Sequence, residues 1–307
     1  MLFSLQLASF LVLLSSNLIA ATKSAGCGAA LPTNSTPGGT SQQFSITSGG
    51  IERTYKLYIP SSYESSTAAP LILSYHGNTR TADDQERISE FSLEKWNTEF
   101  VVVYPNGIDN SWQGASYSAA GVDDVSFTSD LLDHLESTLC IDTDRLYASG
   151  KSNGGGFVGL LTCDSAMSLR ITAFAAVSGA FYPDTRIPCN PTTERAYVPI
   201  IDFHGMNDTT IPYYGGTGKG GALPSIRSWL EDKASRDGCS KAPDTREILK
   251  DGLVWKDVWT CGETDGKRVL VAYNETDLAH KWPGTEQTGD DLVIATPRIL
   301  EFFREWS

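Results

Sequence analysis

Residues 147–157 read Tyr147-Ala148-Ser149-Gly150-Lys151-Ser152-Asn153-Gly154-Gly155-Gly156-Phe157 and contain the pattern G-x-S-x-G. The stretch before it, Arg145–Ser149, is typical of a buried strand, and the residues from Asn153 onward favour a helix. A strand followed at once by a helix needs a sharp turn, and glycines let the backbone pass close to its neighbours. The pattern therefore predicts that Ser152 is an exposed nucleophile at a strained turn above a helix N-terminus.

Short apolar runs alternate with helical patterns on both sides of this turn. Strands are expected at Thr54–Ile59, Leu71–Tyr75, Phe100–Tyr104, Arg145–Ser149, Ala173–Val177, Val198–Phe203 and Arg268–Tyr273. Helices are expected at Asp83–Trp96, Phe127–Leu139, from Asn153, at Ile226–Ala234 and at Pro297–Trp306. This alternation predicts a mostly parallel sheet with helices on both faces, and the serine turn makes it an α/β-hydrolase fold. Sites in such folds lie beyond the carboxyl ends of the strands.

A serine nucleophile needs a base, and this fold supplies its partners in the chain order Ser, acid, His. Of the four histidines, His76 and His134 precede Ser152, and His204 has no suitable acid before it. His280 lies in the loop between the last expected strand and the last helix, which is the usual place for the base. We therefore predict that His280 is the general base.

The acid is expected in the loop that follows the second-to-last expected strand. Asp208 follows the strand Val198–Phe203, at its carboxyl end, where it would accept the Nδ1–H of His280. Asp202 lies inside the strand and would point elsewhere, and Asp257 is a more distant candidate. Asp208 is therefore predicted to complete the triad.

Two backbone N–H groups are expected to form an oxyanion hole. One belongs to Asn153, directly after the nucleophile, and the other to the loop after the strand Leu71–Tyr75. Within that loop we predict the N–H of Asn78, with Thr79 as the alternative. His76 is interpreted as a residue that braces this loop.

The chain of 307 residues begins with an uncharged, largely apolar segment after Met1. Residues 1–21 are predicted to be a signal peptide, residues 22–45 an extended lead-in, and residues 46–307 a single catalytic domain. The alternative, a membrane anchor, is disfavoured because Gln6, Ser15, Ser16 and Asn17 interrupt the apolar stretch. We therefore expect a secreted, extracellular protein.

Six cysteines are consistent with export, and none forms C-x-x-C. Up to three disulfides are expected, and Cys239 with Cys261 is the best local candidate pair because the two flank one polar, turn-rich excursion. Sequons occur at Asn34, Asn207 and Asn274. A glycan on Asn207 would crowd Asp208, so Asn34 and Asn274 are the candidate glycosylation sites.

The net charge of −13 disfavours binding to nucleic acid or to anionic membranes. The sequence contains no H-E-x-x-H, the commonest signature of a zinc site, and no G-x-G-x-x-G in it opens a nucleotide site. We therefore expect neither a metal nor a cofactor, and a soluble extracellular protein that acts on neutral substrates.

Several strings of the chain resemble those of one family. These are the residues 147–157 quoted above, Val177-Ser178-Gly179-Ala180-Phe181-Tyr182, His280-Lys281-Trp282-Pro283-Gly284, Gly26-Cys27-Gly28 and Tyr75-His76-Gly77. They look like fungal secreted feruloyl esterases, which are related to acetylxylan esterases and polyhydroxybutyrate depolymerases. The resemblance implies the same triad, Ser152, Asp208 and His280.

The resemblance also implies a reaction and a substrate. The expected reaction is hydrolysis, through an acyl-enzyme, of feruloyl or similar hydroxycinnamate esters on plant cell-wall xylan, such as feruloylated arabinoxylan. The alternatives are an acetylxylan esterase or polyester depolymerase, and a catalytically inactive polysaccharide-binding protein. Aromatic residues that could line the acyl pocket are Trp112, Tyr213, Tyr214 and Trp282.

Overall fold

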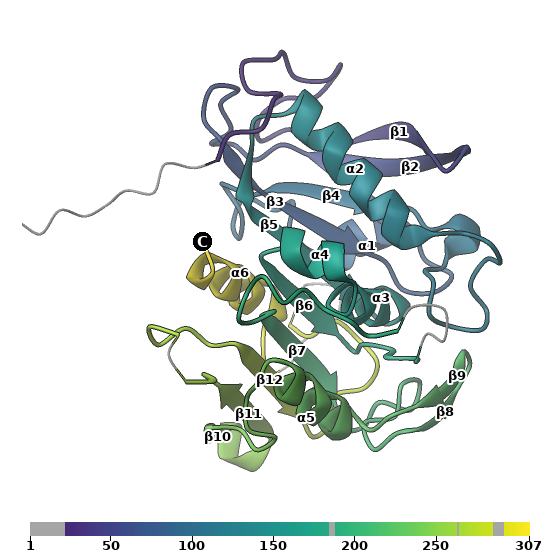
Figure 1. Cartoon of the computed structure of the whole chain (residues 1–307), viewed down its shortest axis with the longest axis vertical. Coiled ribbons are helices and arrows are strands. Elements are labelled where there is room, and N and C mark those ends of the chain that lie inside the picture. The colour runs from purple at the N-terminus through teal and green to yellow at the C-terminus, as the bar shows by residue number, and fades with distance from the viewer. Residues whose placement is uncertain (1–21, 184–187, 263, 285–291) are drawn as a thin grey trace, which may run out of the picture.

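The computed structural model describes residues 22–183, 188–262, 264–284 and 292–307. At its centre is a ten-stranded sheet with the order β1-β2-β4-β3-β5-β6-β7-β12-β11-β10 (Figure 1). The central strands β4, β3, β5, β6, β7 and β12 are parallel, and the pairs at both edges are antiparallel. The functional side chains predicted above therefore follow strands that end at the same edge of the sheet.

The elements have the following bounds. The strands of the large sheet are β1 Gln42–Ser48, β2 Ile51–Tyr58, β3 Ala69–Tyr75, β4 Val101–Pro105, β5 Ile141–Lys151, β6 Ala173–Val177, β7 Ile200–Gly205, β10 Thr245–Leu249, β11 Val254–Trp259 and β12 Leu270–Glu275. A small hairpin consists of β8 Gly216–Gly218 and β9 Gly221–Leu223. The helices are α1 Ala82–Ser89, α2 Asp124–Thr138, α3 Asn153–Leu161, α4 Ser165–Arg170, α5 Ile226–Arg236 and α6 Ala295–Glu305, with 3-10 turns η1 Ile108–Asn110 and η2 Lys250–Gly252.

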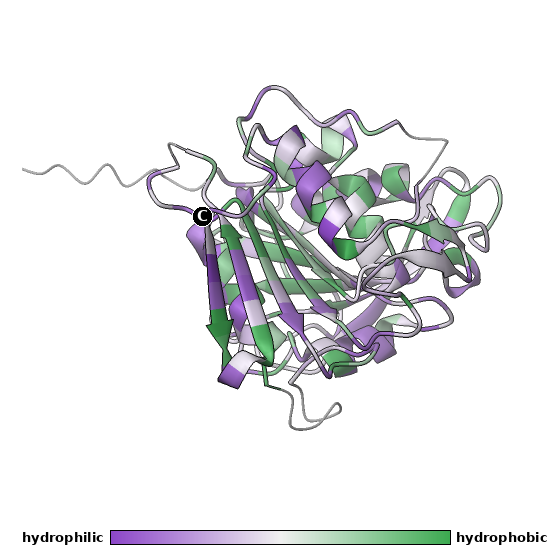
Figure 2. Ribbon diagram, turned by 90° about the horizontal axis from the view of Figure 1, so that it is seen from below, coloured by the Kyte–Doolittle hydropathy of each residue, from purple (hydrophilic) through white to green (hydrophobic). Residues whose placement is uncertain are grey.

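Helices cover both faces of the sheet because its central strands are apolar on both sides. In β3, Leu71 and Leu73 belong to one core cluster, whereas Ile72 belongs to the other. Residues of α2, α3 and α5 pack into the first cluster, and residues of α1 and α6 pack into the second. Figure 2 shows the largely hydrophobic strands between these layers. The α/β-hydrolase fold predicted from the sequence is confirmed.

Some predicted elements need correction. The helix expected at Asp83–Trp96 ends at Ser89, because Glu90 adopts a left-handed conformation with φ 53° and caps the helix. The residues that follow it form turns, with Phe91 buried and the Trp96 indole N–H donating to Glu90. The edge strands β1 and β10, the strand β11, the β8–β9 hairpin and the short helix α4 were not predicted.

The lead-in is closely attached to the sheet. Its last residues already belong to β1, which begins at Gln42. Cys27 is bonded to Cys140, and the Ser24 hydroxyl donates to the carbonyl of Leu139. The predicted signal peptide, residues 1–21, lies outside the described residues. In the part of the chain that the structure describes, no helix is long and apolar enough to cross a membrane.

Candidate active site

Ser152 lies at the sharp turn between β5 and α3. Its backbone has φ 57° and ψ −118°, a conformation that residues other than glycine rarely adopt. Hydrogen bonds hold the turn: the Ser152 N–H donates to Val177, and the Ser152 carbonyl accepts from Gly156 and Ala180. Surrounding structure that holds a strained residue is typical of functional sites.

Two glycines allow this turn to form. A Cβ atom on Gly154 would clash with the carbonyl oxygen of Tyr75 in β3, and one on Gly150 would clash with the carbonyl of Gly154. Because both contacts are with backbone atoms, neither can be relieved by a side-chain rotation. Glycine at these positions therefore brings the start of α3 against the end of β3, where the oxyanion loop begins.

Three side chains from separate loops meet at the carboxyl edge of the sheet. The hydroxyl of Ser152 is 2.8 Å from His280 Nε2, and His280 Nδ1 is 2.7 Å from Asp208 Oδ2. Asp208 follows β7, and His280 follows β12, the neighbouring parallel strand. The structure thus brings together the three residues that the sequence singled out.

Asp208 is held as an ionised acceptor. Its Oδ1 accepts hydrogen bonds of 2.8 Å from the N–H groups of Thr210 and Ile211, which leaves Oδ2 for His280. Burial alone would raise the pKa of Asp208, but these hydrogen bonds and the nearby imidazole hold it below its usual value. The buried His204, whose Nε2 donates to the Ile211 carbonyl, lies 3.5 Å from Oδ2 and fixes the same loop.

His280 is set up as a neutral base. Burial lowers its pKa, the hydrogen bond to Asp208 opposes this shift, and the positive charge of Lys151 adds to it. Since the Asp208 carboxylate only accepts, the proton of the neutral ring lies on Nδ1. Nε2 is then free to accept the Ser152 hydroxyl proton, which is the arrangement that a serine nucleophile requires.

The loop after β3 offers one free donor. The Thr79 N–H donates to the Asn110 carbonyl at 2.8 Å, so the alternative oxyanion donor is already occupied. Among the described residues, the N–H groups of Asn78 and Asn153 have no acceptor. Gly77 sits against Ser152, since a Cβ on it would lie 3.3 Å from the serine Cβ. Asn78 and Asn153 are therefore the two available donors beside the nucleophile.

His76 braces this loop rather than reacting. Its Nε2 accepts the N–H of Gly107 at 3.0 Å, so Nδ1 carries the proton and donates to the Gly77 carbonyl at 2.8 Å. Burial lowers the pKa of His76 to about 4, which keeps the ring neutral. The Trp112 indole donates to the His76 carbonyl, and the Asn153 side chain both donates to and accepts from the Trp112 backbone. Both sides of the oxyanion site are thereby tied together.

A cavity of about 270 Å³ opens at the nucleophile. Its aromatic wall consists of Tyr117 and Tyr182, whose rings lie edge to face at 6.2 Å. The remaining lining residues are Gly77, Asn78, Thr79, Arg80, Lys151, Ser152, Thr210, Ile211, Lys219 and His280.

The four aromatic residues proposed from the sequence for the acyl pocket do not line this cavity. Trp112, Trp282 and Tyr213 are buried in the core or beneath the loops, whereas Tyr214 is 78% exposed. That prediction is wrong, because local sequence does not reveal how deep an aromatic residue lies. Tyr182 could have been suspected from its place in Val177–Tyr182, but Tyr117 had no such signal.

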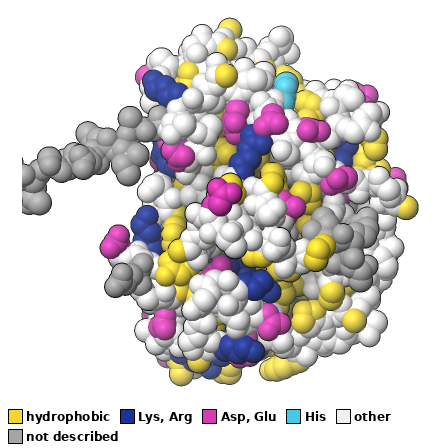
Figure 3. Space-filling view, viewed as in Figure 1, with side chains coloured by type: hydrophobic (Ala, Val, Ile, Leu, Met, Phe, Trp, Pro, Cys, Tyr) yellow, Lys and Arg dark blue, Asp and Glu magenta, His cyan; other side chains and the backbone are white. Residues whose placement is uncertain are grey.

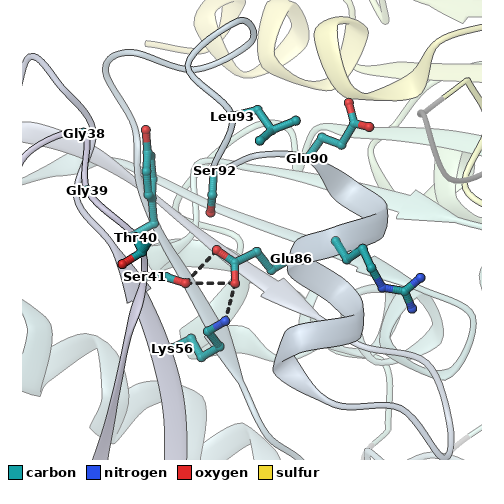
Figure 4. Close-up of a pocket in the computed structure, with 11 residues that line it drawn as sticks. Gly38, Gly39, Thr40, Ser41, Lys56, Glu86, Glu90, Ser92 and Leu93 are labelled. Carbon is teal, nitrogen blue, oxygen red and sulfur yellow. Dashed lines mark hydrogen bonds and ion pairs between the residues drawn. The ribbon is translucent and has the colours of Figure 1, made fainter.

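A larger cavity of about 590 Å³ lies elsewhere, between the lead-in, β2 and α1 (Figure 4). There Glu86 accepts from the Ser41 hydroxyl and pairs with Lys56, which also pairs with Asp83. Its polar groups thus bind one another, and none of the triad residues lines it. The smaller cavity at Ser152 is the candidate active site.

The cysteines form three disulfides. Cys239 is bonded to Cys261, the pair favoured by the sequence, and the other pairs are Cys27–Cys140 and Cys163–Cys189.

The asparagines of the three sequons differ in exposure to solvent. Asn34 and Asn207 are exposed, but Asn274 is 1% exposed within β12. Asn274 as a glycosylation site is therefore a wrong prediction, because a sugar there could not be accommodated in the folded sheet.

Within the described residues, no group of three or more His, Cys, Asp or Glu side chains could hold a metal ion. The site combines a serine hydroxyl, an imidazole, a carboxylate and two free N–H donors, and acyl transfer by a serine requires groups of these kinds.

No protein-family model matches the chain. It is 28% identical over 193 residues to feruloyl esterase B of Piromyces equi, covering 60% of this chain and 35% of the relative. It is 30% identical over 197 residues to a bifunctional acetylxylan esterase/xylanase of Neocallimastix patriciarum, covering 64% and 26%. It is 29% identical over 213 residues to probable feruloyl esterase C of Aspergillus clavatus, covering 67% and 69%. The chain thus spans only about a third of the length of the Piromyces relative and about a quarter of the length of the Neocallimastix relative.

Solved structures show the same fold at lower identity. An acetyl xylan esterase from Aspergillus awamori superimposes with a TM-score of 0.63 at 15% identity, covering 87% of this chain and 100% of that one. An esterase of Thermogutta terrifontis gives a TM-score of 0.52 at 13% identity, covering 86% and 93%. The chain therefore has the α/β-hydrolase fold, and its sequence relatives are fungal feruloyl and acetylxylan esterases.

Proposed function

We propose that the chain is a serine carboxylic ester hydrolase in which Ser152 is the nucleophile, His280 the base and Asp208 the orienting acid. The observation that carries the proposal is the continuous line of hydrogen bonds from Ser152 through His280 to Asp208, 2.8 and 2.7 Å long. This line begins at a strained turn, and two unoccupied N–H groups lie beside it. A merely structural serine would need none of these features.

In the proposed reaction, the Ser152 hydroxyl proton passes to His280 Nε2 while Oγ forms a bond to the ester carbonyl carbon. The N–H groups of Asn78 and Asn153 stabilise the oxyanion, and Asp208 stabilises the imidazolium. When the intermediate collapses, the carbon–alkoxide bond breaks and the alcohol leaves with the proton from His280. Water then attacks the acyl-enzyme by the same steps, which releases the carboxylic acid and regenerates Ser152.

The proposed substrate is a hydroxycinnamate ester of a plant cell-wall polysaccharide, such as feruloylated arabinoxylan. The relatives from Piromyces equi and Aspergillus clavatus both carry the name feruloyl esterase. The faces and edges of Tyr117 and Tyr182 would contact a flat aromatic acyl group. We also propose that the mature protein is secreted, because disulfides such as its three persist in oxidising compartments.

Acetylated xylan is the second candidate, because one relative is named an acetylxylan esterase/xylanase. Methyl ferulate, acetylated xylan and polyhydroxybutyrate, compared at equal enzyme concentration, separate the candidates. We expect the highest kcat/KM on methyl ferulate. A preference for acetylated xylan or for the polyester would replace the feruloyl assignment without changing the triad.

The nucleophile is tested by Ser152→Ala. We expect the variant to keep its melting temperature while kcat falls by about 10⁴-fold or more, because the attacking oxygen is gone. Ser149→Ala is the matched control, since the buried hydroxyl of Ser149 has no hydrogen-bond partner among the described residues. A folded Ser152→Ala protein with near-normal turnover would refute the proposal, as would a parent protein that hydrolyses none of the esters.

A further inference from the structure

Positive side chains surround the cavity at Ser152. Arg80, Lys151 and Lys219 line it, and no Asp or Glu is among its described lining residues. The chain as a whole is acidic, with a net charge of −13. On the face shown in Figure 3, acidic and basic side chains are interspersed. A cavity whose Lys, Arg, Asp and Glu lining residues are all cationic therefore differs from the mixed charge of that face.

The three cations come from separate elements. Arg80 lies in the loop after β3, and Lys151 is the last residue of β5. Lys219 lies at the turn of the β8–β9 hairpin, with its ammonium 5.4 Å from the centre of the Tyr117 ring. The hairpin is held over the cavity because the Gly220 carbonyl accepts the Ser116 N–H and the Gly220 N–H donates to the Tyr182 hydroxyl.

Nearby acidic groups do not neutralise these charges. None of the three cations forms an ion pair within the described residues, and Lys151 donates only to the His280 carbonyl at 3.3 Å. The carboxylate that acts on Lys151 is Asp208, which has no exposed side-chain surface and is bonded to His280. Asp84, whose pKa the charge of Arg80 helps to lower, does not line the cavity and forms its ion pair with Arg87. Burial lowers the pKa of Lys151 to about 8, Asp208 opposes this shift, and Arg80 adds to it. The charge of Lys151 also acts on His280, whose pKa it lowers.

We propose that Arg80, Lys151 and Lys219 select esters that carry a second, anionic group, namely a carboxylate, close to the ester that is cleaved. This proposal rests on the esterase function proposed above and adds a charge preference to it, so that a feruloyl ester on an acidic sugar should react faster than one on a neutral sugar. The carboxylate could belong to the acid half, as in a half-ester of a dicarboxylic acid, or to the alcohol half, as in an esterified sugar acid. It corrects the expectation from net charge alone that the substrates are neutral.

The physical basis is local field rather than net charge. A concave site lined by one sign of charge raises the local concentration of the opposite ion and the rate of association. Guanidinium and ammonium groups on exposed side chains such as Arg80 and Lys219 can also reach a carboxylate directly. Salt screens such interactions over a distance of about 10 Å at 0.1 M ionic strength, so the selectivity must depend on salt.

The test compares pairs of esters of similar size in which one member carries a carboxylate and the other a neutral group. For the acid half, the pair is mono-4-nitrophenyl glutarate and 4-nitrophenyl pentanoate, and for the alcohol half it is 3-acetoxybenzoate and 3-acetoxybenzamide. We expect kcat/KM for the anionic member of at least one pair to exceed that of its neutral partner by about tenfold, and added NaCl to reduce the ratio. The pair that shows the preference identifies the half of the ester that carries the carboxylate.

Arg80→Gln and Lys219→Gln are each expected to reduce the anionic-to-neutral ratio. Lys241→Gln removes the same charge from an exposed position outside the cavity and is the control expected to leave the ratio unchanged. Ratios near one in both pairs, with neutral esters still hydrolysed in a Ser152-dependent manner, would overturn this inference but not the esterase function. An equal decrease in all three variants would also overturn it, since net charge would then be the cause.

Discussion

Asp208 differs from the other buried carboxylates in what its oxygens contact. One oxygen accepts two backbone N–H groups and the other faces His280, whereas Asp257 is paired with Arg246 and Arg227. We predict that Asp208→Asn lowers kcat by about 10³-fold or more, because an amide no longer holds the imidazole in the required tautomer.

The matched variant is Asp257→Asn, which removes a buried acid that pairs with arginines and not with His280. It leaves Arg246 without its carboxylate partner and Arg227 with Glu231 alone, so it should lower the melting temperature rather than kcat. Steady-state kinetics and thermal unfolding of both variants decide between them. If Asp257→Asn lost activity while Asp208→Asn kept it, the acid would have been assigned to the wrong strand end.

Lys151 affects the base through its charge. The groups that face His280 are Asp208, Ser152 and Lys151, with His204 on the far side of Asp208. Because burial and the lysine charge lower the pKa of His280, the free base persists below the usual pKa of histidine, about 6.5. The acid limb of kcat/KM should therefore lie below that of an ordinary histidine.

Removal of the charge reverses part of this shift. Lys151→Met should move the acid limb to higher pH, because the imidazolium is no longer opposed by a nearby cation. Lys151→Arg keeps the charge and should restore the parent profile. Profiles of kcat/KM between about pH 5 and 8 provide the measurement. Identical limbs in the parent and in Lys151→Met would show that the lysine has no electrostatic influence on the base.

At the residue scale, the sequence predicted what chain order and motifs determine. Ser152 was predicted from the turn pattern, and Asp208 and His280 from the order in which the fold supplies its acid and base. The structure places the three side chains in one line of hydrogen bonds. It could not predict Tyr117 or Lys219 at the cavity, because a loop and a hairpin far apart in the chain bring them there. Nor could it predict that Trp112 is buried behind the oxyanion loop.

Among the elements, the buried central strands were the most predictable. Strand β6 has the bounds that its apolar run indicated, Ala173–Val177. The edge strand β10, by contrast, has mostly exposed side chains, so its sequence has little hydrophobic pattern. It is held by its backbone pairing with β11, which the sequence does not reveal. The length of helix α1 was overestimated. The helix ends because Glu90 adopts a left-handed backbone conformation, which the sequence pattern does not indicate.

Strand β7 contains a buried carboxyl group, Asp202, whose ionised form destabilises the folded chain. Asp202 is fully buried between its neighbours Ala176 and Ala272, and neither carboxyl oxygen has a hydrogen-bond partner among the described residues. Burial raises the pKa of Asp202 to about 8. The folded chain therefore binds this proton more tightly than the unfolded chain, in which the pKa is about 3.9.

The contribution of Asp202 to the free energy of unfolding is consequently greatest at pH values below the pKa that Asp202 has in the unfolded chain. This contribution is lost as the pH rises toward about 8, the pKa of Asp202 in the folded chain. We predict that Asp202→Asn has a higher melting temperature than the parent at pH 8 and that the advantage shrinks toward pH 4. The free-energy difference should change by about 1.4 kcal/mol per pH unit across that window. Thermal unfolding across this pH range tests it, and a difference independent of pH would contradict it.

At the scale of the whole molecule, the three disulfides connect very different lengths of chain. Cys27–Cys140 joins the lead-in to the start of β5 across a sequence separation of 113 residues. Cys163–Cys189 and Cys239–Cys261 span only 26 and 22 residues. The first is therefore the covalent link that ties the N-terminal part of the described chain to the central sheet.

The loop lengths predict how much each link stabilises the fold. Loss of a cross-link restores more freedom to the unfolded chain when the loop is longer, about 4.7 kcal/mol for a loop of about 100 residues against about 3 for one of about 15. The double variant Cys27→Ser/Cys140→Ser should therefore lose the most in melting temperature, and the two short-loop pairs should lose less and resemble each other. Each pair is removed together so that no free thiol remains to mispair. If a short-loop pair proved the most important, folded-state contacts near that bond, rather than the freedom of the unfolded chain, would govern the stability of this protein.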